Sequence, residues 1–444
     1  MNTSKFQWLN LSDEDLTDPS LSMEDLLGFS IHLYHYPKEL HPIETMYDCW
    51  ENLKHRDKET FGLLERMHAI QTGWYLAYSF YRLSDIDHAK EACQYAYSLT
   101  DTDLLAGDRI SSLLLSAVIS SFCQEAAQTE KSLEEVRYLL SQRSDKVDGL
   151  NFEYEVVAMR FALSQNDLPA AQKHEKNALS IDDPKLFPSY QDASESFVPG
   201  WRISNLDCGE LRYATSLLAF KQGELDKALQ EAETALNFFR TEASVQQVNT
   251  RNLMSNIYRK EKQYSRAFEQ ASNAWKIRQD VYGDENLLTS ISFGNLCQIA
   301  MDSAESGQEK PLISEDELYA GLKQTVQIRK TCCEKQNSGW YGRALLDLAR
   351  FELATDRMEE AAVTLIRAEQ VFTQIADFYY LLYTVEKEIQ WYQMNLSKKD
   401  LSPVCRDEYQ RLHQYHLRHF AQIVEEKDLY SHPAVKRILR RMDG

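Results

Sequence analysis

The chain of 444 residues is longer than a single compact domain usually grows, yet it has only 15 glycines, 10 prolines and no long Gly/Ser/Pro-rich linker. A β-sandwich or barrel needs many more turn residues, so the composition favours an all-α protein built as a continuous stack. The formal net charge of -19 repels phosphate backbones and anionic lipid. We therefore expect no nucleic acid and no membrane among the partners.

The cysteines and the N-terminus predict a cytoplasmic protein. The eight cysteines are scattered through helical patterns without paired zinc spacing, which fits reduced thiols. The N-terminal stretch MNTSKFQWLNLSDEDLTD is acidic and lacks the basic and apolar regions of a signal peptide. We find no apolar run that approaches the roughly 20 residues needed to span a bilayer.

Residues 1–66 are predicted to form an acidic segment followed by a helical cap. Two amphipathic patterns, EDLLGFSIHLYHY and IETMYDCWENLKHRDKETFGLLERM, occur there. Their apolar sides would cover the first helix pair of the repeats that follow.

A repeat of small residues runs through 67–181 and 206–380. It is clearest after Gly223, where Ala228, Ala232 and Ala235 are followed 39 residues later by Ala267, Ala271 and Ala274. Further frames contain Ala89, Cys93 and Ala96, then Ala171 and Ala178, then Ala361 and Ala368, and two weaker frames cover 110–142 and 289–331. Small residues on the second helix of a pair let the first helix approach closely, so the pattern predicts stacked helix pairs.

Local signals fit these frames and mark the segments between and after them. Asp167 is placed to N-cap a helix that opens near Pro169, and Gly223 lies where the chain turns between two helices. Residues 182–205 read as an irregular connecting loop packed on the surface, and 381–444 as C-terminal helices with a basic tail. That tail could contact acidic lipid or nucleic acid, close a helix C-terminus, or neutralise an acidic neighbour.

The frames resemble the tetratricopeptide repeat family over roughly residues 68–380. The stretch from ALQEAETALNFF through WKIRQDVYGDENLLTSISFGNL is most similar to the long-helix repeats of kinesin light chains. The usual large residue and glycine of the first helix are mostly missing, and spacings of about 40 exceed the family's usual 34. The resemblance implies an all-α, right-handed superhelical α-solenoid of about seven helix pairs with helical N- and C-terminal caps.

In this family the first helices of successive pairs line a concave face where ligands lie, which implies a peptide site between residues 249 and 350. The peptide-binding residues in this register are Asn249, Asn252, Asn256, Arg259, Lys260, Gln298, Arg343 and Arg350, accompanied by Met301 and Leu346. Asparagine amides bind an extended backbone, and Arg and Lys attract carboxylates. The expected partner is a protein or peptide segment that is acidic or has a free carboxylate. Alternatively, these are solvated helix positions that only keep the surface wet.

An aromatic stripe occupies the same register in the first clear pair. It consists of Trp74, Tyr78 and Tyr81, next to Arg82. Large aromatic side chains at such positions could contact a hydrophobic partner segment. The alternative is packing between repeats or burial under the cap.

Catalytic and metal-binding patterns give no site. His413, His416 and His419 share a three-residue spacing with His32 and His35, as zinc or di-iron sites require, but no recognisable acidic or cysteine ligand pattern accompanies them. The sequence contains no P-loop, no GxGxxG after a strand, no GxSxG and no HExxH. We therefore expect no metal, no cofactor and no enzymatic activity.

Two functional hypotheses remain. The first is a non-enzymatic scaffold that holds a protein or peptide segment in its concave groove. The second is a regulatory sensor, because a helical cap followed by repeats resembles the layout of Rap-type peptide receptors, in which a peptide changes the curvature of the solenoid. Self-association, which would make a homo-oligomer, is compatible with the open ends and aromatic-rich terminal helices of a solenoid.

Overall fold

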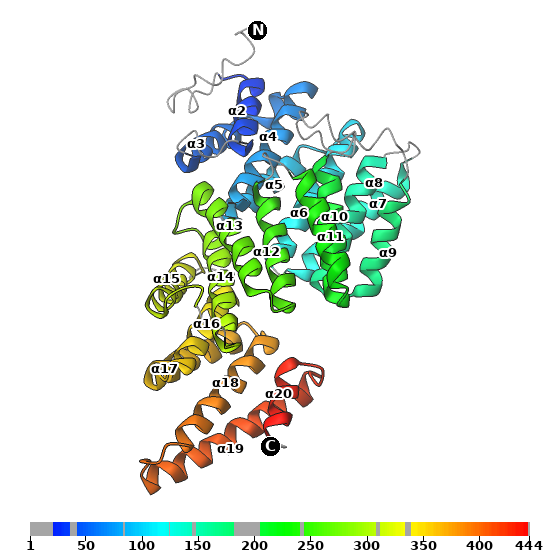
Figure 1. Cartoon of the computed structure of the whole chain (residues 1–444). Helices are drawn as coiled ribbons and strands as arrows, with labels where there is room; N and C mark the ends of the chain where they lie inside the picture. Colours follow the sequence, from blue (N-terminus) through cyan, green and yellow to red (C-terminus); the bar gives the residue numbers. More distant parts are fainter. Residues whose placement is uncertain are drawn as a thin grey trace. The chain divides into compact units, whose positions relative to one another are not determined.

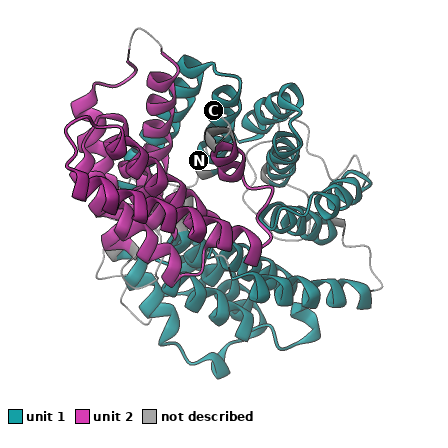
Figure 2. Cartoon of the chain, turned by 90° about the horizontal axis from the view of Figure 1, so that it is seen from below, with its two compact units in different colours: residues 1–283 teal, residues 284–444 magenta. Residues whose placement is uncertain are grey.

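The computed structural model describes residues 21–35, 42–82, 85–123, 125–143, 148–181, 205–239, 244–307, 311–333 and 339–442. Within these residues the chain is α-helical, with 3-10 turns at Lys58–Thr60 and Asp103–Leu105 and no strand. It forms two compact units, Met1–Gly283 and Asp284–Gly444 (Figure 2). The division falls inside the predicted block 206–380, and the predicted loop 182–205 lies outside the described residues except for its last one.

Unit 1 is a stack of helix pairs behind two N-terminal helices (Figure 1). The N-terminal helices are α2 (Met23–His35) and α3 (Pro42–Lys54). The pairs are α4 (Leu63–Arg82) with α5 (Ile86–Ser98), α6 (Ala106–Phe122) with α7 (Ala126–Gln142), α8 (Asp148–Ser164) with α9 (Leu168–Leu179), α10 (Asn205–Gln222) with α11 (Leu225–Phe238), and α12 (Ser244–Lys260) with α13 (Tyr264–Tyr282). Each first helix also contacts the first helix of the next pair.

The small residues that defined the repeat lie between the helices of each pair. The fully buried ones in unit 1 are Ala89, Ala96, Ala171, Ala178, Ala228, Ala232, Ala235, Ala267, Ala271 and Ala274. The approach is closest where α4 crosses α5, because a Cβ added at Gly73 would lie 3.0 Å from Ala96 Cβ and 3.2 Å from the carbonyl oxygen of Ala92. The predicted reason for the spacing, close packing within a pair, is confirmed.

The turns inside the pairs share one geometry. Asp167 N-caps α9 as predicted, with a side-chain oxygen accepting from the Ala170 N–H at 3.0 Å. Gly223, just before the N-cap of α11, has a φ of +85°, where glycine adds no Cβ penalty. The equivalent residue in three other pairs is also left-handed but carries a side chain: Asn166, Lys262 and Asp356. Ala376 has the same conformation in a turn that joins one pair to the next. The turn geometry is therefore retained even where the sequence lacks the favoured glycine.

The N-terminal helices form the predicted cap. Helices α2 and α3 both pack against α4, and Phe29 and Trp50 are buried between them and the first pair. The Tyr95 hydroxyl of α5 donates to the carbonyl oxygen of Leu53 at 3.1 Å. The cap is thus part of the core of unit 1.

Helix α6 is more apolar than the sequence reading allowed. Together with its preceding turn it spans Asp103–Phe122, which by length and composition alone could cross a membrane; 56% of its apolar 18-residue window is buried inside the protein. Ile110, Leu114 and Ala117 are fully buried in a cluster that includes Val136 of α7. Burial inside the stack accounts for the apolar character of this helix.

Unit 2 contains further helix pairs and a terminal helix. They are α14 (Leu287–Glu305) with α15 (Glu315–Cys333), α16 (Gly339–Ala354) with α17 (Met358–Gln374), α18 (Phe378–Leu396) with α19 (Pro403–Glu426), and α20 (Pro433–Met442), which packs on α18. The predicted C-terminal helices therefore begin slightly earlier than residue 381 and form a helix pair of their own.

The pair α14/α15 packs without the row of alanines, which explains why its repeat pattern is weak in the sequence. A Cβ at Gly321 would lie 2.5 Å from the ring of Phe293, and one at Gly294 would lie 2.5 Å from Arg329 Nη2. Arg329 is 3% exposed and donates from Nη2 to the Ser290 carbonyl oxygen at 2.9 Å. Two glycines and a buried arginine thus replace the alanine row.

Helix α20 carries the basic tail. Arg437 donates from Nε and Nη2 to the carboxylate of Glu386 at 2.6 and 2.5 Å, and Glu386 is fully buried. Lys436 is exposed. For Arg437 the structure therefore shows the interpretation in which the tail neutralises an acidic neighbour.

Candidate functional site

The first helices of unit 1 present two equivalent rows of side chains. Counting back from the N-cap of each second helix defines them. Row A, seven residues before the N-cap, is Tyr78, Val118, Arg160, Leu217 and Asn256; row B, three residues before it, includes Phe122, Ser164, Lys221 and Lys260. These positions lie one helical turn apart, so the two rows share one face of the stack.

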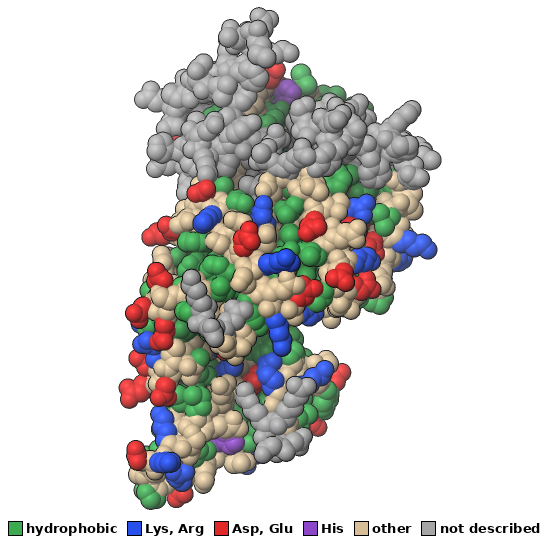
Figure 3. Space-filling view, in the orientation of Figure 1, with side chains coloured by type: hydrophobic (Ala, Val, Ile, Leu, Met, Phe, Trp, Pro, Cys, Tyr) green, Lys and Arg blue, Asp and Glu red, His purple; other side chains and the backbone are tan. Residues whose placement is uncertain are grey.

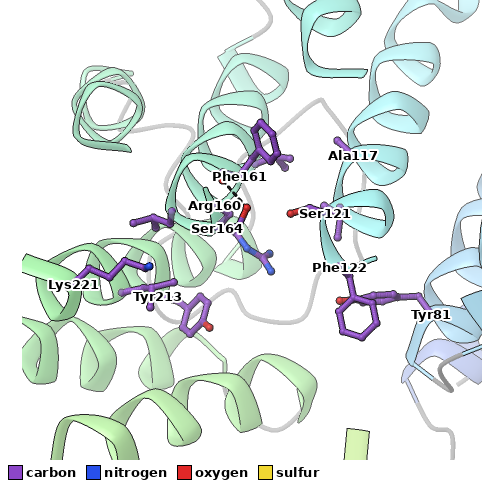
Figure 4. A pocket seen from close by; sticks show the side chains of 13 residues that line it. Tyr81, Ala117, Ser121, Phe122, Arg160, Phe161, Ser164, Tyr213 and Lys221 are labelled. Carbon is purple, nitrogen blue, oxygen red and sulfur yellow. Dashed lines mark hydrogen bonds between the residues drawn. The ribbon is translucent and has the colours of Figure 1, made fainter. Parts of the chain in front are cut away.

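A pocket of about 300 Å³ opens on this face (Figure 4). Four successive first helices, α4, α6, α8 and α10, contribute to it. Its lining residues are Tyr81, Ala117, Val118, Ser121, Phe122, Val157, Arg160, Phe161, Leu163, Ser164, Tyr213, Leu217 and Lys221. The wall combines aromatic and aliphatic groups with hydroxyls and two cations, and none of the lining residues is acidic.

One side of the pocket is aromatic. The rings of Tyr81 and Phe122 meet edge to face, with centroids 5.0 Å apart, and Phe161 of α8 lines the pocket with them. Burial raises the pKa of Tyr81 to about 12, against a smaller opposite effect of Arg160. The Tyr81 phenol is therefore a neutral O–H donor at pH 7.

Arg160 brings positive charge into the pocket. Its Nη1 donates to Glu210 Oε2 of α10 at 2.9 Å. The Glu210 carboxylate raises the pKa of Arg160, outweighing burial. Figure 4 shows the guanidinium extending into the space between α8, α6 and α10, with Tyr213 and Lys221 on the α10 side.

Lys221 closes the α10 side. Its Nζ donates to Asn166 Oδ1 at 3.2 Å, and burial lowers its pKa. Burial raises the pKa of Tyr213, so this phenol is also a neutral donor. Together with the hydroxyls of Ser121 and Ser164, the pocket is richer in hydrogen-bond donors than in acceptors.

The predicted residues of α12 continue the rows beyond the pocket. Asn256 belongs to row A and is half-buried, and Lys260 belongs to row B, with Nζ 4.6 Å from the centre of the Phe220 ring. Asn249 Oδ1 accepts from Nη2 of Arg278 at 3.0 Å. The remaining predicted residues of this helix, Asn252 and Arg259, are half-buried.

The predicted residues of unit 2 lie on α14 and α16, where they link neighbouring helices. Gln298 Nε2 donates to both carboxylate oxygens of Asp347, at 3.0 and 2.8 Å. Arg350 Nη2 lies 2.6 Å from both Asp302 Oδ1 and Glu305 Oε2. Burial alone would lower the pKa of Arg350, but these carboxylates raise it.

Arg343 is held by aromatic rings of unit 2. Its guanidinium carbon lies 4.7 Å from the Trp340 ring and 4.1 Å from the Tyr380 ring of α18. Leu346 is half-buried, and Met301 is buried. The unit-2 part of the predicted site therefore already makes contacts inside the stack.

The predicted aromatic stripe divides between core and pocket. Trp74 is 2% exposed, and its Nε1 donates to Ser112 Oγ of α6 at 2.8 Å. This is the packing alternative, so Trp74 cannot serve as a surface contact. Tyr81 lines the pocket, and Tyr78 is half-buried beside it in row A.

Comparisons with known proteins identify the architecture. No family model matches the sequence, and no curated protein matches it either. The structure is similar to that of a Rap protein complexed with Competence and Sporulation Factor, with a TM-score of 0.53, 12% identity, and coverage of 84% of this chain and 96% of that one. It is also similar to a STAND signal-transduction ATPase with a tetratricopeptide repeat sensor from Pyrococcus horikoshii, with a TM-score of 0.53, 13% identity, and coverage of 88% of this chain and 54% of that one.

The chain has the tetratricopeptide-repeat fold. In such a stack, first helices of successive pairs share a face, which is how residues from α4 to α10 come together although their sequence positions span 81 to 221. Sequence reasoning missed Arg160, Phe161, Tyr213 and Lys221. The register could have found two of them, because Arg160 belongs to row A and Lys221 to row B, whereas Phe161 and Tyr213 lie outside both rows.

The histidines of α19 face carboxylates of the preceding helices of the tetratricopeptide-repeat stack. His416 Nδ1 lies 3.0 Å from Glu388 Oε2, and His419 Nδ1 lies 3.8 Å from Glu369 Oε1. Burial lowers the pKa of His413. Among the described residues no group of three or more potential ligands is arranged to hold a metal ion; the side chains of His32 and His35 lie outside them.

Proposed function

We propose that unit 1 is a non-enzymatic scaffold that binds a protein or peptide segment on the face formed by its first helices. The observation that carries this proposal is the pocket itself, where the first helices of four successive pairs place aromatic rings beside neutral phenols and two cations. Concave, mostly apolar pockets with a few convergent polar groups are the usual form of ligand sites. The same combination suits a peptide with a bulky apolar side chain.

The partner we propose is acidic or carries a free carboxylate. The chain has a net charge of -19, yet the pocket is lined by Arg160 and Lys221 and by no carboxylate. On the side of the molecule that Figure 3 shows, acidic and basic side chains are interspersed. Positive charge is therefore a local property of the pocket, and charge complementarity favours an anionic partner.

The bound segment would extend along α12. Asn249, Asn252, Asn256, Arg259 and Lys260 continue the face by one helix pair. Neighbouring helix axes lie about 10 Å apart, and an extended chain rises about 3.3 Å per residue. A path from α8 to α12 thus accommodates about six residues of ligand.

Gln298, Arg343 and Arg350 are proposed as a second, weaker contact region in unit 2. A ligand carboxylate approaching Arg350 has to compete with Asp302 and Glu305, which already hold its guanidinium. Breaking an existing pair offsets much of the gain from a new one. The aromatic side of the unit-1 pocket consists of the uncharged side chains Tyr81, Phe122 and Phe161, so an apolar ligand group that packs there does not compete with an ion pair.

Partner capture tests the scaffold proposal. The variants Phe161→Ala and Tyr213→Ala remove pocket surface, whereas Tyr138→Ala removes an exposed tyrosine of α7 outside the pocket. The tagged protein should lose a partner peptide or protein with the first two variants and retain it with the third. Circular dichroism checks that all three remain folded. Equal capture by all three would refute the pocket as the binding site.

A peptide-responsive sensor is the second candidate function. The similarity to a Rap protein complexed with Competence and Sporulation Factor, and to an ATPase with a tetratricopeptide repeat sensor, favours it over a passive holder. A sensor should change its radius of gyration in small-angle scattering when the ligand binds, because its conformations differ in affinity. A passive scaffold should gain thermal stability from the ligand without that change. For either role we propose a cytoplasmic location, supported by seven described cysteines that are all free thiols.

A further inference from the structure

The inner part of the pocket combines charge and hydrogen-bond donors around Arg160. Tyr81 of α4 and Tyr213 of α10 both lie close enough to Arg160 and Glu210 for those charges to shift their pKa values, after the larger effect of burial. Both phenols remain protonated at pH 7 because burial raises their pKa values. The groups that a ligand meets here are thus O–H and N–H donors from three helices.

Glu210 is positioned behind this group of donors. Its side chain is 17% exposed and does not line the pocket, whereas the Arg160 side chain is 34% exposed and does. The ion pair therefore leaves part of the guanidinium facing the pocket. A guanidinium has five N–H groups in a planar fork and can bind a second acceptor while keeping the first.

We propose that the pocket holds one anionic group of the ligand against Arg160, and that Glu210 limits the strength of this contact. The inference rests on the proposed function of unit 1 and adds the chemistry of its ligand: a carboxylate or a phosphate next to a bulky apolar residue. The apolar residue packs on Phe161 and Phe122, and the anion accepts hydrogen bonds from Arg160 and the phenols. Glu210 repels the incoming anion and shares the guanidinium with it.

The charge balance supports an anion over a cation. Lys221 also lines the pocket, so the local sum over Arg160, Lys221 and Glu210 is one positive charge. A cationic ligand group would meet two like charges and no carboxylate in the lining. An uncharged amide could accept the same hydrogen bonds, but it would not compensate the positive charge of the pocket as a carboxylate or phosphate does.

Oriented peptide pools test the proposal on the full-length chain. Each pool is a fluorescently labelled, degenerate nonapeptide with a fixed central Phe followed by Glu, Gln, Lys or phosphoserine, and binding is followed by anisotropy. The wild-type protein should bind the Glu pool about tenfold more tightly than the Gln pool, the size of one charge-assisted hydrogen bond. A phosphoserine pool that binds more tightly still would identify phosphate, and not carboxylate, as the anion source.

Two variants with opposite effects separate charge recognition from damage to the fold. Arg160→Gln should bring the Glu and Gln pools within about twofold of each other, because the local sum over Lys221 and Glu210 is then zero. Glu210→Gln should tighten binding of the Glu pool severalfold, a gain that misfolding does not produce. Lys173→Gln, which removes an exposed charge of α9 away from the pocket, should leave all pools unchanged.

The results distinguish failure of this inference from failure of the proposed function. If Phe161→Ala weakens binding of both pools but Arg160→Gln leaves their ratio unchanged, the anion site is wrong and the peptide pocket stands. If the Lys pool binds best, the charge assignment is reversed and the inference is overturned. If no pool binds and the pocket variants also leave partner capture unchanged, both proposals fail together.

Discussion

Lowering the pH should loosen α20 from α18, because His432 caps α20 in its neutral form. Its Nδ1 accepts from the Ala434 N–H at 3.1 Å, so the proton of the neutral ring resides on Nε2. The ring is 2% exposed and lies 4.3 Å from the ring centroids of both Tyr379 and Tyr383. A proton on Nδ1 would break the cap. It would also place a positive charge in a buried site between the rings of Tyr379 and Tyr383.

The size of the effect follows from the pKa of His432. Burial lowers this pKa from 6.5 to about 4; a backbone contact at Tyr379 and the charge of Glu386 oppose the shift, and Arg437 adds to it. The unfolded chain therefore binds the proton first as the pH falls. The contribution of neutral His432 to the free energy of unfolding is fully present above pH 6.5 and is lost progressively as the pH falls to about 4. The total loss over this range is about 3 kcal/mol.

The assay compares urea unfolding of the wild type and His432→Asn at pH 7.5 and pH 4.5. Asparagine is a good N-cap and does not titrate, so the variant should resemble the wild type at pH 7.5. Between the two pH values the wild type should lose about 2 to 3 kcal/mol more than the variant. His55→Asn, at an exposed site, controls for the general effect of replacing a histidine. Parallel pH profiles for all three proteins would refute the reasoning.

Two further predictions concern the packing of unit 2. Gly342→Ala places a Cβ 2.7 Å from the fully buried ring of Phe372, so thermal unfolding should show a loss of stability of about 1–3 kcal/mol. The control Gly62→Ala, at an exposed position, should show no loss. Equal melting temperatures for the two variants would contradict the packing argument. Arg437→Met leaves the buried carboxylate of Glu386 without its counter-ion and should cost about 3 kcal/mol in urea unfolding, with partial recovery on adding Glu386→Gln. A single substitution without measurable cost would show that water reaches this carboxylate.

The helix pairs were predictable because close approach restricts residue size at few positions. Ala228 and Ala267 lie at the same place in two pairs because any larger side chain would separate the helices. The same logic failed to give a clear frame for α14 and α15, where Gly294 makes room for the guanidinium of Arg329. A pattern built on alanines cannot anticipate a pair packed around a buried arginine.

The site was only partly predictable, because the repeat register gives the helix face on which a residue lies but not how deeply its side chain is buried. Register placed Trp74, Tyr81 and Asn256 on one face of the first helices, and the counting holds in the structure. Burial depends on the neighbouring helix: small Ser112 lets the Trp74 ring sink between α4 and α6, whereas Phe122 meets the Tyr81 ring at the rim of the pocket. A single sequence carries no such information about neighbours from another repeat.

The pocket shows how one repeated backbone can present different side chains at equivalent positions. Row A is occupied by Val118, Arg160, Leu217 and Asn256 in successive pairs, although the turn that fixes each position is the same. The alanines between the helices tolerate little change, whereas the half-buried residues of row A differ in size and charge from pair to pair. A search for sequence repeats therefore detects the alanines between the helices, which give no information about ligand binding. The pocket that we propose as the ligand site is built from such variable positions on four first helices, from Tyr81 of α4 to Lys221 of α10.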